Sequence, residues 1–289
     1  MSRATSPRAS RAGLAAVLAV GALALAACGS GDAGSGATGN SDAATDAGSG
    51  ATSGATGEAT DDATAGDLSG DLTVFAAASL HGVSTERGDT LMAANPDLTV
   101  TFSFAASSAL AEQVNSGAPA DVLATASAAT MEQVGDLVVD PVTFATNTLV
   151  IVTPADNPGG VSGLPDFTNP DLRIAVCTEE VPCGAAAAKV FTAAGLTPAV
   201  DTYAENVTAA LTLASTGEVD AALVYATDAL SAEDAVTTIE FPEAAEAVNA
   251  NLVGVLADAP NPAAAQAFVD LVLSPEGADV LRSAGFGTP

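Results

Sequence analysis

The sequence predicts an α/β fold, because strand-like and helical patterns take turns from about residue 71 to the end of the chain. The expected strands cover 72–76, 98–104, 121–125, 148–152, 172–176, 221–225 and 252–256. The expected helices cover 80–94, 108–117, 184–194, 207–215, 262–273 and 275–284. This alternation indicates mainly parallel sheets, in which ligands bind beyond the carboxyl ends of strands and at helix N-termini.

The first elements follow from alternation and from helix-ending residues. Residues 72–76 alternate apolar and polar side chains like a strand, and Ser79 follows as a possible N-cap. The helix over 80–94 is the least regular, because it contains Gly82 and Gly88, and an Asn-Pro pair ends it. Its irregular sequence leaves its boundaries poorly defined.

The next elements repeat this order. Residues 98–104 alternate clearly, and a short helix follows with Leu110 and Val114 spaced at i and i+4 and a stop at Gly117. A strand over 121–125 comes next.

The later elements are read from apolar runs and their boundaries. A loop rich in proline and glycine separates the strands 148–152 and 172–176. Gly195 and Gly217 end the two helices that follow, and 221–225 and 252–256 read as buried strands. The last two helices each begin with a proline.

The N-terminal 70 residues have a different composition. Residues 1–11 carry arginines and no acid and 12–27 are wholly apolar, which predicts a signal peptide over 1–27. The stretch LAAC that ends at Cys28 resembles the lipobox of bacterial lipoproteins, in which the cysteine receives the lipid; an incidental cysteine is the alternative. Residues 28–70 are rich in Gly, Ala, Ser, Thr and Asp, so they predict a flexible acidic linker rather than a calcium loop.

Charge and cysteine content exclude several classes of function. The formal net charge of −28 argues against nucleic-acid binding and against an electrostatic membrane patch. Cys177 and Cys183 remain once Cys28 is assigned to the lipid, and an exported chain meets oxidising conditions. We therefore expect a Cys177–Cys183 disulfide.

Two similar runs, FAAASL at 75–80 and FAASSAL at 104–110, stand where a strand should pass into a helix. Small side chains there would let a ligand approach backbone N–H groups, and serine adds a hydroxyl donor. Two ordinary N-caps are the simpler alternative.

Further motifs follow in a fixed order, namely GAPADV, VPCGAAA, AENVTAAL and ALVYATDA. Together the motifs resemble those of the periplasmic molybdate-binding proteins of ABC transporters, which have the type II periplasmic binding-protein fold. The resemblance covers about residues 71–286. It implies two α/β lobes, 71–147 with 243–289 and 148–242, joined by a hinge of two crossings with the ligand in the cleft.

The resemblance also implies the site and its ligand. Molybdate or tungstate would be held by the hydroxyls of Ser79, Ser107 and Tyr225 and by the backbone N–H groups of Cys183 and Val207. No other cofactor and no direct protein–metal ligand is implied. The implied function is capture of the oxyanion by a monomeric, lipid-anchored protein on the outer face of the cytoplasmic membrane. The ligand would then pass to a permease that is paired with a cytoplasmic ATPase.

The sequence departs from the family pattern in places. Ala106 stands where a serine is common, Ser127 where an aspartate is usual, and Ala250-Asn251 near the place of a missing Tyr-Pro pair. His81-Gly82 and Arg87-Gly88 interrupt a helix that is usually more apolar. None of these positions is an implied ligand donor, so they affect the helix boundaries and the hinge.

Charge supports such a site independently of the resemblance. The cations after residue 70 are Arg87, Arg173, Lys189 and Arg282, and none lies in the motifs. An anion site must then use neutral donors and helix N-termini. Without a charged partner, size would have to separate molybdate and tungstate from the smaller sulfate.

The sequence offers little support for other functions. An enzyme would need a base for Ser79 or Cys183, and the single histidine, His81, is two residues from Ser79, where helical side chains point apart. A zinc site lacks further ligands beside Cys177 and Cys183. A binding protein for sulfate, phosphate or an organic anion stays open, although a carboxylate site would favour an arginine that the motifs lack. A purely structural surface lipoprotein leaves the motifs unexplained.

Overall fold

The structure is a computed structural model that describes residues 67–289. The predicted signal peptide, the lipidation site Cys28 and residues 28–66 of the predicted linker lie outside the described residues. Leu68 was expected in the linker, but it is buried and its N–H donates to the side chain of Asn95. The linker therefore ends earlier than residue 70. Among the described residues, no helix is long and apolar enough to span a membrane.

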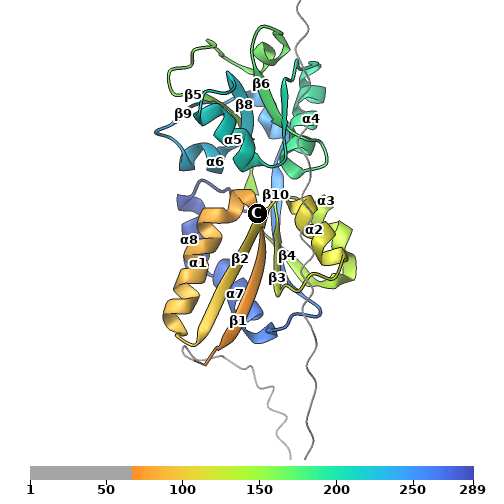
Figure 1. The fold of residues 1–289 in the computed structure, drawn as a ribbon, viewed down its shortest axis with the longest axis vertical. Helices are drawn as coiled ribbons and strands as arrows, with labels where there is room; N and C mark the ends of the chain where they lie inside the picture. Colours follow the sequence, from red (N-terminus) through yellow and green to blue (C-terminus); the bar gives the residue numbers. More distant parts are fainter. Residues whose placement is uncertain (1–66) are drawn as a thin grey trace, which may run out of the picture. The chain divides into compact units, whose positions relative to one another are not determined.

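Two five-stranded sheets form the framework (Figure 1). The first has the order β2-β1-β3-β10-β4. Its strands are β1 (Gly70–Ala77), β2 (Leu98–Ala105), β3 (Val122–Thr125), β4 (Val138–Asn147) and β10 (Asn249–Leu256). β1 lies parallel to β2 and β3, whereas β10 lies antiparallel to β3 and β4.

The second sheet repeats this plan with the order β7-β6-β8-β5-β9. Its strands are β5 (Leu149–Pro154), β6 (Ile174–Cys177), β7 (Thr202–Ala204), β8 (Ala221–Tyr225) and β9 (Val236–Ile239). β6 lies parallel to β7 and β8, and β5 lies antiparallel to β8 and β9.

Both sheets are mixed, so the expectation of mainly parallel sheets was wrong. β5 and β10 cause the difference, because the chain enters each of them from the other sheet. A crossover helix that would force a parallel pairing does not precede either strand. The chain passes from the first sheet to the second at Thr148 and returns at Val248.

The described residues form eight helices, which pack on the sheets or on one another. They are α1 (His81–Ala94), α2 (Ser107–Asn115), α3 (Ala128–Val134), α4 (Pro182–Ala194), α5 (Val207–Ser215), α6 (Ala226–Ser231), α7 (Pro262–Leu273) and α8 (Pro275–Ser283). Short 3-10 turns are η1 (Ala78–Leu80), η2 (Gly135–Leu137), η3 (Leu164–Thr168) and η4 (Pro242–Ala247). These are the helices of the described residues, and most coincide with an expected helix.

Each sheet has its own core. On the first sheet, α1 and α7 pack over one face around Leu72, Val74 and Phe268, and α2 and α3 cover the other face around Phe75 and Leu123. Alternate residues of β1 thus point to opposite cores, as the pleat of a strand requires. The second sheet buries a separate cluster beneath α4 and α5.

The division into lobes stays a proposal, with one boundary changed. η4 packs against α4, and Ala247 belongs to the core of the second sheet. We therefore extend the second lobe from 242 to Ala247, later than the sequence suggested.

The glycines that obscured α1 in the sequence have different surroundings. A Cβ at Gly88 would lie 2.6 Å from the Phe102 ring, so glycine there lets α1 pack closely on β2. A Cβ at Gly82 would have nothing within 4 Å. The weak helical pattern at Gly88 therefore has a packing reason, while Gly82 lies on the exposed side.

Candidate functional site

All five residues implied as ligand donors line one small cavity of 20 Å³. Ser79 lies in η1 directly after β1, and Ser107 begins α2 directly after β2. Cys183 is in the first turn of α4, Val207 begins α5, and Tyr225 ends β8. The cavity thus takes residues from both sheets, at the junctions between strands and helices that the sequence indicated.

Small or neutral residues complete the wall. They are Ala77, Ala78, Ala105, Ala106, Ala126, Val181, Pro182 and Asn206. None of the charged side chains that the structure describes lines this cavity. Its polar side chains are hydroxyls and one amide, and the alanines leave the backbone N–H groups accessible.

The hydroxyls of Ser79 and Ser107 differ in their hydrogen bonding. Ser79 Oγ is buried and has no hydrogen-bond partner among the described residues. An unsatisfied buried hydroxyl costs stability unless something binds it. Ser107 is 1% exposed, and its Oγ accepts a hydrogen bond of 2.9 Å from the backbone N–H of Ala126. Its hydroxyl hydrogen is therefore left to donate in another direction.

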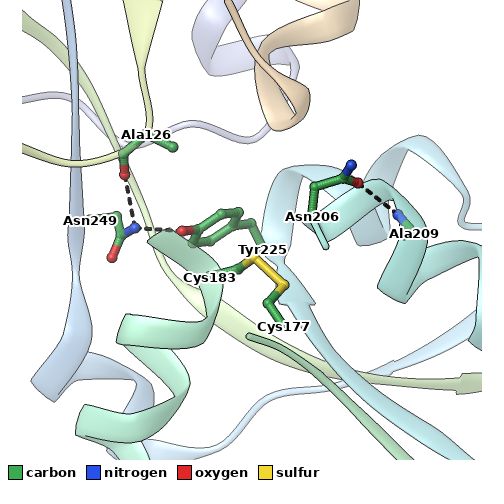
Figure 2. Close-up of a disulfide and its surroundings, with 7 residues drawn as sticks. All are labelled: Ala126, Cys177, Cys183, Asn206, Ala209, Tyr225 and Asn249. Carbon is green, nitrogen blue, oxygen red and sulfur yellow. Dashed lines mark hydrogen bonds between the residues drawn. A yellow bond between two sulfur atoms is a disulfide. The ribbon is translucent and has the colours of Figure 1, made fainter. Parts of the chain in front are cut away.

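Tyr225 presents its hydroxyl from the second sheet. The side chain is buried, and its hydroxyl is hydrogen-bonded to the amide of Asn249 (Figure 2). Burial raises the pKa of Tyr225 well above its usual value, and the nearby Asp228 carboxyl raises it further. The phenol therefore stays protonated and able to donate at physiological pH.

Three helix N-termini meet at the cavity. The side chain of Asn206 caps α5 by accepting from the backbone N–H of Ala209 at 2.9 Å (Figure 2). Ser107 and Val207 are the first residues of their helices and Cys183 is the second of its helix, so their N–H groups have no partner within the helix. Such N–H groups and the partial positive charge of a helix N-terminus favour an anion.

A disulfide fixes the approach to α4. Cys177 ends β6 and is bonded to Cys183 in the structure, with their Cα atoms 5.7 Å apart (Figure 2). Next to it, a Cβ at Gly184 would lie 1.8 Å from the carbonyl oxygen of Thr178. Both the disulfide and Gly184 hold the turn between strand and helix tightly, and this turn brings Cys183 to the wall of the small cavity.

The positive side chains lie elsewhere. Arg87 pairs with Glu86 and Arg173 with Asp220, each at 2.7 Å, and Arg282 pairs with Asp279. Asp220 has a pKa below its usual value because of the hydrogen bond from Arg173. None of these arginines, nor Lys189, lines the small cavity.

A larger cavity of 660 Å³ adjoins the small one and shares Ala78, Ser79 and Asn206 with it. His81 lies on its wall, with its ring 4.4 Å from that of Phe104. Because the small cavity has about the room of one water molecule, an oxyanion could enter only if the walls move apart. The larger cavity is the space from which it would come.

Asp228 is a buried carboxyl that acts electrostatically on Tyr225. It lies on the wall of the larger cavity, it is 7% exposed, and its Oδ2 has no partner among the described residues. Burial raises its pKa to about 7, although hydrogen bonds from the backbone oppose the shift. Among the described residues, no group of three or more acidic, histidine or cysteine side chains could hold a metal ion.

Sequence reasoning did not single out Asn206, Asp228 or Asn249. Asn206 could have been found, because asparagine directly before a helical pattern is a typical N-cap. Asp228 falls inside the motif ALVYATDA, but its burial is not visible in a short helix. Asn249 gives no local signal, since its partners are far away in the chain.

Comparisons with known proteins agree with this geometry. The model of the bacterial extracellular solute-binding protein family matches residues 72–287. The molybdate-binding protein ModA of Mycobacterium tuberculosis is 42% identical over 221 residues, which is 75% of this chain and 85% of the relative. A putative ABC transporter substrate-binding lipoprotein, YvgL of Bacillus subtilis, is 27% identical over 223 residues, which is 74% of this chain and 85% of the relative.

Solved structures show the same fold. The periplasmic molybdate-binding protein of Azotobacter vinelandii superposes with a TM-score of 0.67 at 20% identity, over 75% of this chain and 99% of that one. The sulfate-binding protein SubI of M. tuberculosis superposes with a TM-score of 0.61 at 17% identity, over 75% of this chain and 86% of that one. The two-sheet architecture is therefore the expected type II periplasmic binding-protein fold. With these similarities, the chain belongs to the bacterial extracellular solute-binding proteins, a family of exported binding proteins rather than enzymes, and within it to the ModA group.

Proposed function

We propose that this chain captures molybdate or tungstate outside the cytoplasm and delivers it to the permease of an ABC transporter that is powered by a cytoplasmic ATPase. The observation that carries this proposal is the small cavity, which is lined by the five proposed neutral donors from both sheets and by no charged side chain of the described residues. The 42% identical relative is a molybdate-binding protein, which supports the choice of ligand.

The proposed ligand fits the chemistry of the donors. At neutral pH molybdate is a tetrahedral dianion whose oxygens only accept hydrogen bonds, so every polar group around it should donate. The hydroxyls of Ser79, Ser107 and Tyr225 and the N–H groups of Cys183 and Val207 meet this demand. The protein needs no cofactor and no direct bond to the metal. We also propose that it works as a monomer, whose two lobes close on the ligand and form the surface that the permease recognises.

The second candidate is another tetrahedral oxyanion, such as sulfate or phosphate. The similar fold of the sulfate-binding protein SubI favours it, since the fold alone does not fix the ligand. Neutral hydrogen-bond donors would bind any dianion of suitable size. Discrimination therefore has to come from the size of the closed cavity.

We further propose that the protein is held at the outer face of the cytoplasmic membrane by a lipid on Cys28. The sequence before this cysteine supports the anchor, and YvgL, a relative, is named as a lipoprotein. A two- or three-chain anchor would hold firmly, because each buried CH₂ contributes about 0.8 kcal/mol.

Ligand selectivity provides the first test. Isothermal titration with molybdate, tungstate, sulfate and phosphate should show the first two binding at least about a hundredfold more tightly than sulfate, a difference of about 2.7 kcal/mol. The larger oxyanions should reach donors on both walls at once. Equal affinity for sulfate would instead favour the second candidate.

Removal of single donors provides the second test. Ser79→Ala, Ser107→Ala and Tyr225→Phe should each weaken molybdate binding about ten- to a hundredfold, since a hydrogen bond to a charged group contributes about 1.5–3 kcal/mol. Titration calorimetry at one fixed ionic strength measures the loss.

Three matched variants control for general effects. Ser108→Ala removes a neighbouring hydroxyl that does not line the small cavity. Arg87→Ala and Lys189→Ala remove cations that do not line it either. Each should change the affinity less than about threefold. A large loss in a cation variant, together with small losses in the serine variants, would contradict the proposed site.

The anchor has its own test. Cys28→Ala should leave the protein without lipid, so the variant should appear in the soluble fraction outside the cells while the parent stays with the membrane. Fractionation and intact mass measure both effects. If the variant is retained on the membrane like the parent, the anchor proposal is wrong.

Asp228 gives a pH-dependent prediction. Its pKa in the folded state, about 7, lies above its ordinary value of 3.8, so the folded state binds more protons between these values than the unfolded state. The carboxyl therefore contributes full stability only below about pH 4, and that contribution is lost as the pH rises to 7. In the parent, the free energy of unfolding should fall over this pH range by about 4 kcal/mol at most because of Asp228. Asp228→Asn should not show this fall. Urea unfolding from pH 4 to 8 measures the difference.

The exposed Asp89 of α1 provides the control, because Asp89→Asn removes a carboxyl that is not buried. This variant should follow the parent's pH dependence. A profile of Asp228→Asn that runs parallel to that of the parent would show that Asp228 does not titrate in this range.

A further inference from the structure

Two buried asparagines stand where the chain passes between the sheets. Asn147 is the last residue of β4 and Asn249 is the first of β10, and the two face each other in the β4–β10 ladder. Each donates its side-chain amide to the second sheet's half of the molecule. Asn147 Nδ2 donates to Thr227 Oγ1 at 2.8 Å, and Asn249 Nδ2 donates to the hydroxyl oxygen of Tyr225. The pair therefore ties the halves together at both crossings.

Asn249 differs from Asn147 because it also reaches a second acceptor. Its Nδ2 donates to the backbone carbonyl of Ala126 at 2.8 Å, directly after β3 (Figure 2). A carbonyl oxygen can only accept, so the NH₂ end of the amide must point this way. Both hydrogens of Asn249 Nδ2 are then used, one for Ala126 and one for Tyr225.

This direction decides what Tyr225 can do. Its oxygen accepts from Asn249, so its own hydrogen has to be donated elsewhere, and Tyr225 lines the small cavity. The backbone N–H of Ala126 acts on Ser107 in the same way, because it donates to Ser107 Oγ. Ala126 and Asn249 together thus connect one donor of the first half to one donor of the second.

We propose that Asn249 is a positioning residue for the oxyanion: it aims the Tyr225 hydroxyl into the small cavity and sets it relative to Ser107 through the backbone of Ala126. The proposal rests on the proposed function for the identity of the ligand. The hydrogen bond between Asn249 and Tyr225, in contrast, is independent of the proposed function.

The competing explanation is that Asn249 only ties the two halves together. Asn147 allows the two explanations to be distinguished. Asn147 occupies the facing ladder position and makes the same kind of bond, but its acceptor, Thr227, does not line the small cavity. If only the tie matters, Asn147→Ala and Asn249→Ala should affect binding alike.

The first experiment is a double-mutant cycle with molybdate, measured by titration calorimetry on the purified protein at one ionic strength. Asn249→Ala should weaken binding about ten- to a hundredfold. In that background, adding Tyr225→Phe should cost less than about threefold more, since the hydroxyl is no longer aimed. Asn147→Ala should cost less than about threefold. Additive losses for Asn249 and Tyr225, or an equal loss for Asn147→Ala, would overturn the proposal.

Asn249→Asp tests the direction of the hydrogen bond with nearly the same shape. A carboxylate accepts from Tyr225 and takes its hydrogen away from the ligand. It would also lose the bond to the Ala126 carbonyl. We expect this variant to bind molybdate no better than Asn249→Ala, even where its thermal stability is close to that of the parent. Binding close to that of the parent would contradict the proposal.

A measurement without ligand keeps the inference separate from the proposed function. The chain has no tryptophan and two tyrosines, and Tyr203 is 61% exposed, so Tyr203→Phe leaves Tyr225 as the single tyrosine. The Raman doublet of tyrosine reports whether the phenol oxygen accepts or donates a hydrogen bond. In this background Asn249→Ala should shift the doublet and Asn147→Ala should not.

The outcomes of the two experiments differ. If the parent fails to bind molybdate, the proposed function fails, but a shifted doublet still supports the arrangement of Asn249 and Tyr225. An unchanged doublet in Asn249→Ala overturns the positioning role whether or not molybdate binds. If Asn249→Ala does not fold, Asn249→Asp is measured in its place.

Discussion

The proposed site depends on one constraint, namely that an anion must be held where none of the described positive side chains reaches. Arginines 87, 173 and 282 are each paired with a neighbouring carboxylate, and none reaches the small cavity. Stabilisation then has to come from dipoles: hydroxyls, backbone N–H groups and helix N-termini. Dipoles act only at short range, so their positions must be exact to fractions of an ångström, and the fold around the cavity supplies that precision.

The two mixed sheets supply this precision because the parallel strands of both sheets have their carboxyl ends at the same cavity. β1 and β2 bring Ser79 and Ser107 from one side, and β6, β7 and β8 bring Cys183, Val207 and Tyr225 from the other. β5 and β10 are the strands that the chain enters directly after each crossing, and they run antiparallel to their neighbours. The feature that departs from a simple α/β pattern is therefore the feature that joins the two halves of the site.

Features that depend on residues close together in the sequence could be predicted, whereas features that depend on residues far apart in the sequence could not. The five residues proposed as donors each stand in a short motif at a junction, and the structure brings all five to one cavity. The order of the motifs indicated the family. Helices such as α7 were visible from their own residues. β4 was not, since Asp140 has a positive φ and Pro141 interrupts the pattern, and β7 has only three residues. Asn249 was missed because its bond to Ala126 joins residues 123 positions apart.

The acidic composition and the neutral cavity are compatible because they act over different distances. At physiological ionic strength, charges farther away than about 8 Å are largely screened, so most of the net charge of −28 has little effect on a bound anion. Asp228 is the exception, since it is buried near Tyr225, where screening is weak. Its raised pKa keeps it largely uncharged below pH 7, so this buried carboxyl adds little repulsion there. The burial that destabilises its charged form is thus the same property that makes a neutral-donor anion site possible beside it.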